Sequence, residues 1–379
     1  MSGVEIVGYS PELEDQVAGL WADIFGDELG ERRAYLKWKY ERNPYLPDPI
    51  LFVALDGDGH VIGTRGFCGT CWQTPEESVV IPCAEDFAIA PEHRNTGLAT
   101  AIMRVALADM EQRGYAYVMN ATGGEVTVLH SLAMGWKSVG AMEPVVRLAP
   151  NARVRRSIYQ LAQQSRRLLR LRVSRTAYRT LYGFGRTSFA RLDRIAREKS
   201  VESRAAIVVE SSPSPDKLAD MAARLPLDGR IRHVRDRTFF EWRFANPTRE
   251  YRFLRYELEG LTEGYMAIAH YRSHHPPTIP FHISDWQGTS PEVCARLLET
   301  ALDWGDFQAL GAWTASLSED SKALLVHSGF EPIQSETLAR GQPCVLLKKL
   351  GPPGDWSVGG VPAVDPARWD IQLIDSMHG

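Results

Sequence analysis

The stretch from Val79 to Met103, VVIPCAEDFAIAPEHRNTGLATAIM, joins a β-prone run, a polar turn and the start of an amphipathic helix. A strand-to-helix turn of this kind leaves the first helical N–H groups without partners and aims them at one point. Together with the helix dipole, these groups form a site for an anion such as a pyrophosphate. Gly97 lets backbone come close to a ligand, and Ala99 is too small to block it. The stretch therefore predicts a phosphate-binding loop.

The loop also resembles a known family. Arg94-Asn95-Thr96-Gly97-Leu98-Ala99 matches the Arg/Gln-x-x-Gly-x-Gly/Ala loop of the GCN5-related N-acetyltransferase (GNAT) superfamily. The upstream Ala88-Ile89-Ala90-Pro91 resembles that family's strand exit, and Glu85-Asp86 resembles its acidic pair on the same strand. The position of the motif between a β-run and an amphipathic helix makes the match specific. The alternative is an ordinary strand-loop-helix turn that binds no ligand.

Acyl transfer from a thioester to an amine requires that the protein fix the CoA, polarise the thioester carbonyl and remove a proton from the attacking ammonium. The resemblance assigns the CoA contacts to the loop and to the strand before it, namely Phe87, Ala88, Ile89, Arg94, Asn95, Thr96, Gly97, Leu98 and Ala99. One N–H of the strand is expected to polarise the carbonyl. Asn120 follows the next strand, where the strands are expected to splay, and it would bond the pantetheine or the acceptor. The resemblance implies acetyl-CoA as co-substrate and no metal.

Glu85 is the first candidate for the base and Asp86 the second, each acting directly or through one water. Because successive side chains on a strand alternate faces, one of the two should reach the cleft. The alternative is that both bond neighbouring backbone or arginines. Members of the family often have a tyrosine, as general acid, four residues before the glycine that corresponds to Gly135. Ser131 stands there, beside His130, and a serine hydroxyl is a poorer acid than a phenol, so water is an alternative proton source.

The composition is that of a globular protein of two domains. The chain has 379 residues, of which 44% are hydrophobic and 24% charged, and a formal net charge of −4. These values exclude a disordered or fibrous protein, and the length exceeds what one compact core supports. No apolar run approaches the length of a membrane span, and the first residues lack the basic-then-apolar pattern of a signal peptide. We therefore expect a cytoplasmic protein without a transmembrane segment.

The predicted elements of residues 1–150 follow the GNAT order: a strand, two helices, three strands, a helix, a strand, a helix and a strand. The expected fold class is α/β, with mixed sheets of the α+β kind, and this part is predicted to be the acyl-CoA-binding domain. Residues 151–200 are rich in arginine and are expected to form helices with one basic face. Three interpretations of this segment stay open: a connector lying on acidic domains, a contact to an anionic lipid or polysaccharide surface, and nucleic-acid binding. The last is the least favoured, because no nucleic-acid motif supports it.

The chain then repeats itself. Trp38-Lys39-Tyr40-Glu41-Arg42-Asn43-Pro44 has a counterpart in Trp242-Arg243-Phe244-Ala245-Asn246-Pro247, and each copy is followed by two β-runs. The repeat predicts a tandem GNAT with a second, degenerate domain over residues 201–350 and a tail over residues 351–379. The second copy has Ser284-Asp285-Trp286-Gln287-Gly288-Thr289-Ser290 in place of the anion loop. We expect it not to hold acyl-CoA, but to build the other wall of an acceptor cleft or to stabilise the first domain.

The sequence therefore predicts an acyl-CoA-dependent N-acyltransferase, with acetyl transfer to a primary amine of a small molecule or envelope precursor as the preferred form. Two alternatives stay open. A non-catalytic acyl-CoA-binding or scaffold protein would need the loop but no base or acid. A Fem-like aminoacyltransferase would use aminoacyl-tRNA, and the intact CoA loop argues against that donor. Mycothiol-synthase-like enzymes, with one competent and one degenerate domain, are the closer analogy.

Overall fold

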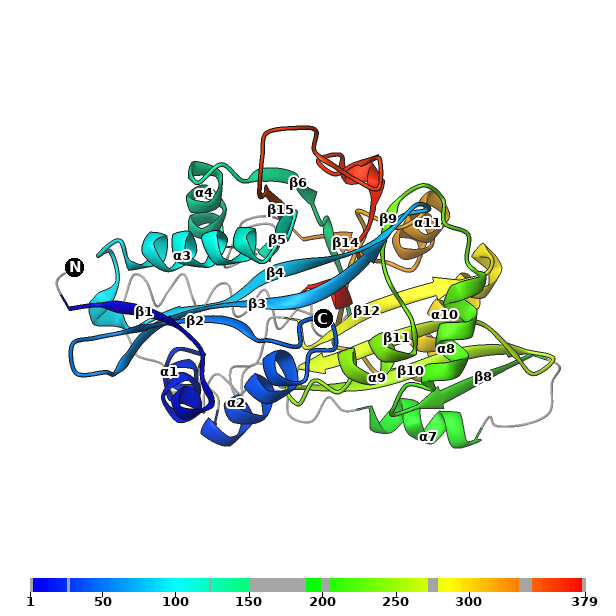
Figure 1. Cartoon of the computed structure of the whole chain (residues 1–379). Helices are drawn as coiled ribbons and strands as arrows, with labels where there is room; N and C mark the ends of the chain where they lie inside the picture. Colours follow the sequence, from blue (N-terminus) through cyan, green and yellow to red (C-terminus); the bar gives the residue numbers. More distant parts are fainter. Residues whose placement is uncertain are drawn as a thin grey trace, which may run out of the picture.

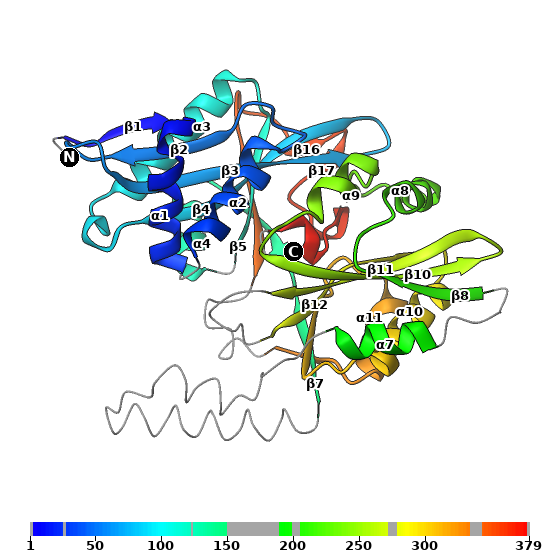
Figure 2. The same cartoon turned by 90° about the horizontal axis from the view of Figure 1, so that it is seen from below.

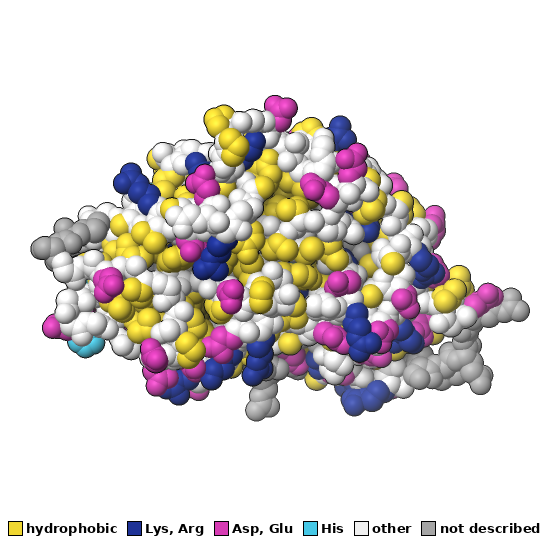
Figure 3. All heavy atoms as spheres, viewed as in Figure 1, with side chains coloured by type: hydrophobic (Ala, Val, Ile, Leu, Met, Phe, Trp, Pro, Cys, Tyr) yellow, Lys and Arg dark blue, Asp and Glu magenta, His cyan; other side chains and the backbone are white. Residues whose placement is uncertain are grey.

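A computed structural model describes residues 3–25, 28–122, 124–149, 189–198, 205–271, 279–333 and 343–376. These residues form two mixed sheets, each with helices on both faces, which lie side by side and make an α/β fold (Figure 1). On the face seen in Figure 3, hydrophobic side chains gather across the middle, and acidic and basic side chains are interspersed around its edges. Among the helices of the described ranges, none combines the length and apolar character needed to cross a bilayer.

The first sheet has the order β1-β2-β3-β4-β5-β15-β6, and β9 and β18 extend it beside β3. Its strands are β1 (Glu5–Gly8), β2 (Ile50–Leu55), β3 (Val61–Gln73), β4 (Ser78–Ile89), β5 (Tyr117–Thr122), β6 (Lys137–Ala141), β9 (Ile231–His233), β15 (Cys344–Lys349) and β18 (Trp369–Asp370). Helices α1 (Glu14–Phe25) and α2 (Leu29–Leu36) cover one face, and α3 (Leu98–Gln112) and α4 (Glu125–Ala133) lie on the other. A five-residue π turn, Lys37–Glu41, follows α2.

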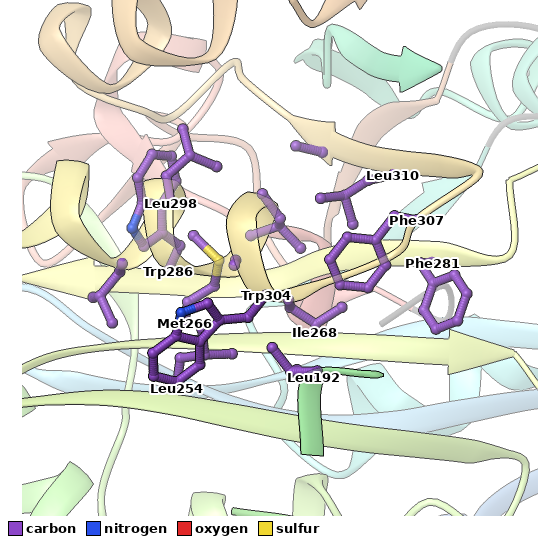
Figure 4. Close-up of a cluster of buried hydrophobic side chains, with 14 of the residues drawn as sticks. Leu192, Leu254, Met266, Ile268, Phe281, Trp286, Leu298, Trp304, Phe307 and Leu310 are labelled. Carbon is purple, nitrogen blue, oxygen red and sulfur yellow. The ribbon is translucent and has the colours of Figure 1, made fainter. Parts of the chain in front are cut away.

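The second sheet has the order β14-β7-β13-β12-β11-β10-β8. Its strands are β7 (Pro144–Leu148), β8 (Ala205–Glu210), β10 (Arg249–Leu258), β11 (Leu261–Tyr271), β12 (Phe281–Gly288), β13 (Ala309–Trp313) and β14 (Glu331–Pro332). Helices α7 (Ala190–Glu198), α10 (Pro291–Trp304) and α11 (Glu319–His327) pack on one face around the apolar cluster in Figure 4. Helices α8 (Pro215–Arg224) and α9 (Arg237–Arg243) pack on the other.

The two sheets exchange one strand each. Strand β7 follows β6 directly in the sequence, yet it lies between β13 and β14 of the second sheet. Strand β15 comes from the far end of the second half and lies between β5 and β6 of the first sheet. Val345, Leu346 and Leu347 of β15 are all fully buried. A continuous apolar run of this kind suits a strand that is covered on both faces.

The C-terminal segment binds the two halves together. A small hairpin of β16 (Ser357–Val358) and β17 (Val361–Pro362) precedes β18, and a 3-10 turn over Leu373–Asp375 follows it. The Trp369 ring packs edge-on against Trp72 at 5.0 Å. Ile374 is buried in the second half, against the cluster that α8 and α9 cover. The end of the chain therefore lies at the junction of the two sheets (Figure 2).

Three predictions from the sequence can be compared with the structure: a helix, the domain boundaries and the arginine-rich segment. The sequence predicts one helix from about Glu31 to Arg42, but α2 ends at Leu36 and the chain continues as the π turn, whose wider turn buries Trp38, Lys39 and Tyr40 in succession. The predicted domain boundaries at residues 150, 200 and 350 stay a prediction. Because β7 and β15 are exchanged, neither sheet is built from one side of these boundaries alone. Most of the arginine-rich segment lies outside the described residues. Its described end, α7, packs on the second sheet, where Asp193 pairs with Arg252 at 2.7 Å.

Candidate active site

The anion loop is built by backbone conformations that few residues adopt. After β4 ends, a 3-10 turn over Pro91–His93 leads to Asn95 and Gly97, whose φ angles are 62° and 84°. Gly97 is the N-cap of α3, and no side chain accepts a hydrogen bond from the first turn of that helix. The free N–H groups and the positive end of the helix dipole therefore point toward the loop. Glycine suits this cap, because left-handed backbone costs it little.

The polar side chains of the loop bond to the loop itself. Arg94 donates from Nε to the carbonyl of Ile89 at 3.2 Å, and the hydroxyl of Thr96 donates to the carbonyl of His93 at 2.7 Å. Leu98 is buried against the sheet, and Ala99 is half-buried. These contacts fix the shape of the turn and leave the amide groups as the anion donors.

The second half has no such loop at the matching helix. The hydroxyl of Ser290 accepts from the N–H of Val293 at 3.4 Å and caps α10, and Pro291 supplies no N–H at the first helical position. A Cβ placed on Gly288 would lie 2.9 Å from the sulfur of Cys294. The N-terminus of α10 is thus closed by its own residues.

Strands β4 and β5 are parallel and diverge. Within the described residues their ladder holds one pair, Cys83 with Met119, although β4 continues to Ile89. The far edge of β5 pairs with β15, so the gap opens only on the β4 side. The residues predicted to contact CoA, Phe87 to Ile89, lie on this free stretch of β4. A gap of this kind can accept an extended chain that bonds to the strand edge.

Two predicted site residues carry buried polar atoms without partners among the described residues. They are the amide nitrogen of Asn120, which lies within β5 opposite Leu346 rather than past the strand as expected, and the hydroxyl of Ser131, on α4. Both side chains are at most 2% exposed. The neighbouring His130 bonds through Nε2 to the hydroxyl of Thr100 at 2.9 Å. Because buried polar groups are nearly always bonded, these two atoms point to a polar ligand that supplies the missing partners.

Strand β4 carries a bulge at the acidic pair. Glu85 lies opposite Gly66 and Ala88 opposite Thr64, so one extra residue lies between them on β4. Asp86 adopts φ 47°, which is rare for a residue with a side chain. The bulge breaks the expected alternation, and both carboxylates contact the ammonium of Lys39. Strained backbone of this kind is concentrated at functional sites.

Asp86 is held from several sides. Its carboxylate accepts from Lys39 at 2.8 Å, from the hydroxyl of Tyr40 at 2.5 Å and from the hydroxyl of Tyr35 at 3.2 Å. Burial is the largest single effect and would raise the pKa of Asp86, but the charge of Lys39 and the hydrogen bonds from Lys39 and Tyr40 together outweigh it and lower the pKa. Burial would likewise lower the pKa of Lys39, and Asp86 and Glu85 outweigh it and raise that pKa well above the usual value. The ammonium of Lys39 therefore lies between the two carboxylates of Glu85 and Asp86.

A small cavity of about 10 Å³, enough room for about one water molecule, lies where the two halves meet. The first half contributes Tyr35, Trp38, Lys39, Cys68, Thr70 and Glu85. The second half and the C-terminal segment contribute His233, Trp242, Arg243, Asn246, Asp375 and Ser376. Glu85 therefore faces the cavity, whereas Asp86 is not among its lining residues.

The repeated tryptophans form a pair across this junction. The rings of Trp38 and Trp242 stack at 5.5 Å with an interplanar angle of 19°. Each indole N–H donates to the backbone carbonyl of the other tryptophan, at 2.7 and 2.9 Å. The two copies of the repeat thus meet face to face and bring the two halves together around the cavity.

Sequence reasoning missed several residues of this site. Lys39 lies inside the repeat, but nothing in the sequence pattern indicates that it belongs to the site. Behind the lining residues of the second half, Arg235 bonds to both oxygens of Asp285, at 3.0 and 3.1 Å, and also pairs with Asp375, which in turn bonds to His233. The repeat is the one sequence signal that points to this junction, because it places Trp38 and Trp242 in equivalent positions.

Comparison with known proteins agrees with this geometry. A model of the acetyltransferase (GNAT) domain matches residues 6–131. No curated protein sequence matches the chain. Solved structures that resemble it include a GCN5-related N-acetyltransferase from Anabaena variabilis, with 12% identity and a TM-score of 0.57 over 92% of this chain and 73% of that one. A conserved protein of unknown function from Enterococcus faecalis, described as a probable N-acyltransferase, has the same identity and coverage and a TM-score of 0.60.

A third solved structure is a tandem GNAT protein from the clavulanic acid biosynthesis pathway. It has 14% identity and a TM-score of 0.55, over 93% of this chain and all of that one. At these identities the resemblance shows the fold, and the domain match adds the family of the first half. Residues 6–131 therefore match an acetyltransferase (GNAT) domain, and the chain shares the fold of solved GNAT proteins, one of them a tandem GNAT protein.

Proposed function

We propose that the protein is an acyl-CoA-dependent N-acyltransferase that transfers an acyl group, with acetyl as the preferred one, to a primary amine of a small molecule. One observation carries the proposal. In a domain of the GNAT family, the N-terminus of α3 opens without a side-chain cap behind two left-handed residues, Asn95 and Gly97. The backbone groups of residues 94–99 would hold the pyrophosphate, with Arg94 adding charge.

The rest of the donor would lie along the free edge of β4. The pantetheine arm would bond to backbone of Phe87, Ala88 and Ile89, one of whose N–H groups would polarise the thioester carbonyl. The unpartnered atoms of Asn120 and Ser131 fit this assignment, because an amide-rich arm offers both donors and acceptors. The second half would bind no donor, since Ser290 caps its helix.

The acceptor amine would approach Glu85 at the junction of the two halves, where Glu85 lines the small cavity. Glu85 would take the proton of the attacking ammonium, and the free amine would then attack the thioester carbon. The CoA thiolate would leave with a proton from water or from Ser131. Asp86, bonded to Lys39, Tyr35 and Tyr40, would hold the ammonium of Lys39 in place rather than move a proton.

The ion pair of Glu85 with Lys39 favours one alternative, a non-catalytic acyl-CoA-binding protein. The ammonium of Lys39 already contacts the carboxylate of Glu85, so an incoming amine would have to compete with it for that carboxylate. This alternative requires CoA binding but no transfer to any amine, so turnover separates it from the enzyme.

Calorimetry with CoA and acetyl-CoA on the full chain tests the donor site. Wild type should bind with micromolar affinity, about −8 kcal/mol, and Gly97→Glu should lose about 1,000-fold. The carboxylate would meet the pyrophosphate, and two like charges about 4 Å apart cost about 4 kcal/mol near a protein surface. Gly114→Glu is the matched control, because Gly114 has φ 83°, open space around it and a place at the other end of α3. Equal affinity in both variants, or no binding by wild type, would refute the donor site.

A further inference from the structure

The second sheet has a gap between two parallel strands, as the first sheet does. Among the described residues, the ladder of β12 and β13 ends at the pair of His282 with Gly311, although β12 continues to Gly288. The other edges of these two strands pair with β11 and β7, so the free stretch of β12 borders only the gap. In the first half, the same arrangement leaves a stretch of β4 free beside β5.

The bulge of β4 also has a counterpart on β12. The extra residue there is Ser284, next to Asp285. Asp285, like Asp86 on β4, accepts from a tyrosine hydroxyl at 2.5 Å and contacts a buried cation. Trp286, which follows Asp285, therefore corresponds to Phe87, on the stretch of β4 that is proposed to hold the donor arm.

The C-terminal segment fills the gap of the second half. The N–H of Trp286 donates to Oε1 of Gln372 at 2.8 Å, and Nε2 of Gln372 donates to the carbonyl of Trp286 at 3.1 Å. On the β13 side, the N–H of Ile371 donates to the hydroxyl of Ser316 at 2.9 Å. All four residues are buried, and Figure 2 shows the C-terminal turn beside β12. One carboxamide thus satisfies both backbone groups that Trp286 presents to the gap.

A network of charged groups holds the turn that presents this carboxamide. The N–H of Gln372 donates to the carboxylate of Asp375 at 2.8 Å, and Arg235 contacts the same carboxylate at 3.2 Å. Arg243 donates from Nε to the carbonyl of Ile374 at 2.8 Å. The side chain of Gln372 also accepts from the N–H of Asp375 and so caps its own turn. Because Arg243 and Asp375 line the small cavity, the filled gap also fixes one side of the junction.

We propose that the gap between β12 and β13 is a carboxamide-binding cleft whose resident ligand is the side chain of Gln372. The C-terminal segment thus takes the place that the arm of an acyl donor would take in the first half, and the chain keeps one free donor gap. The comparison with the donor arm rests on the proposed function, whereas the cleft and its occupant do not. The ligand class follows from Trp286, because its N–H and carbonyl together require one acceptor and one donor, which a carboxamide offers side by side.

Three substitutions in the full chain separate this site from a local role of Gln372. Gln372→Ala removes the carboxamide and leaves a space of the size of acetamide, whereas Gln372→Met removes the carboxamide and fills the space. Gln287→Ala is the matched control, because Gln287 lies on β12 beside Trp286, is 7% exposed like Gln372, and has an Oε1 without a partner among the described residues. If Gln372 only capped its own turn, acetamide would not restore the contact to Trp286.

Hydrogen exchange of the Trp286 amide, followed by NMR, reports on the site. It should be about tenfold or more faster in both Gln372 variants than in wild type and Gln287→Ala, because the amide has lost its partner. Acetamide should slow it again, to saturation, in Gln372→Ala alone, and N,N-dimethylacetamide, which has no N–H, should not. Exchange in Gln372→Ala that ignores acetamide would overturn the inference, and so would unchanged exchange in Gln372→Met, which decides the matter if the smaller variant does not fold. None of these measurements needs CoA, so failure of wild type to bind CoA would overturn the proposed function alone.

Discussion

Replacing Lys39 by methionine tests whether the buried charge group of the first half is a unit. Methionine keeps much of the length and apolar stem of lysine but removes the ammonium. That ammonium is 3% exposed, donates to the hydroxyl of Tyr35 at 2.5 Å and contacts the carboxylates of Glu85 and Asp86. The variant therefore leaves two carboxylates, 6% and 3% exposed, without a cation.

The expected cost follows from that geometry. Breaking a buried ion pair by removing one partner destabilises a protein by about 3–5 kcal/mol. Lys37→Met is the matched control, two residues away in the same turn. Lys37 is 41% exposed and pairs with Glu14 at 3.0 Å, and an exposed pair contributes about 0–1 kcal/mol. The difference between the two variants should therefore be about 3 kcal/mol or more.

The pH dependence of this difference has a definite sign. In wild type the pKa of Asp86 is below 3.8 and that of Lys39 above 10.5. Asp86 therefore stabilises the folded state at pH values above its ordinary pKa, and this stabilisation is lost as the pH falls through the lowered pKa of the folded state. Lys39 stabilises the folded state at pH values below its ordinary pKa, and this stabilisation is lost as the pH rises through the raised pKa of the folded state. Between these limits the wild-type group should contribute a nearly constant stability.

In Lys39→Met the carboxylates have no cation, so the folded variant takes up protons more readily than the unfolded chain. The variant should recover stability as the pH falls from about 8 to about 5, by about 1.4 kcal/mol per pH unit for each extra proton bound. Urea unfolding of wild type, Lys39→Met and Lys37→Met at both pH values measures this. If Lys39→Met costs no more than Lys37→Met, or costs the same at both pH values, the group is not coupled as described.

Three further predictions concern the junction, the helix caps and the base. Trp38→Ala and Trp242→Ala should each lower the free energy of unfolding by about 3–5 kcal/mol. A double-mutant cycle should give a coupling energy of about 0.5–1.5 kcal/mol from the ring stack, and strictly additive effects would contradict that contact. Ser290→Ala should cost about 1 kcal/mol of stability, since it removes the cap that Val293 uses, and should leave the affinity for CoA unchanged; lost affinity would place a donor in the second half. Glu85→Gln should lower acetyl transfer by about 100-fold or more without weakening CoA binding, and unchanged turnover would show that the base is elsewhere.

Local signals in the sequence predicted the elements that position the donor loop. The sequence predicts a helix over residues 291–304, and α10 has these bounds, because the cap of Ser290 and the proline after it act within a few residues. The two β-runs around Pro82 are one continuous strand, β4, and the loop to Gly97 lies where the motif placed it. These features depend on residues that are neighbours in the chain.

The remainder of the site depends on distant residues, and no local pattern contains it. Lys39 has the sequence pattern of an exposed helical lysine, and it is buried only because the π turn and the bulge at Asp86 face each other. His233 and Asp375 are 142 positions apart, so nothing near either one indicates the other. The exchange of β7 and β15 cannot be predicted from the sequence for the same reason, since an apolar strand does not specify which sheet it joins.

That exchange has a consequence for how the chain is made. The strand that fills the first sheet between β5 and β6 is synthesised only after nearly the whole second half, on the order of 10–40 s later at usual rates of translation. Until then β5 and β6 present open edges, and the adjacent β7 is the nearest strand able to occupy them. A nascent chain can thus form a local β6-β7 hairpin that must come apart before both sheets close. The first sheet therefore becomes complete only when a strand from beyond the second half has joined it.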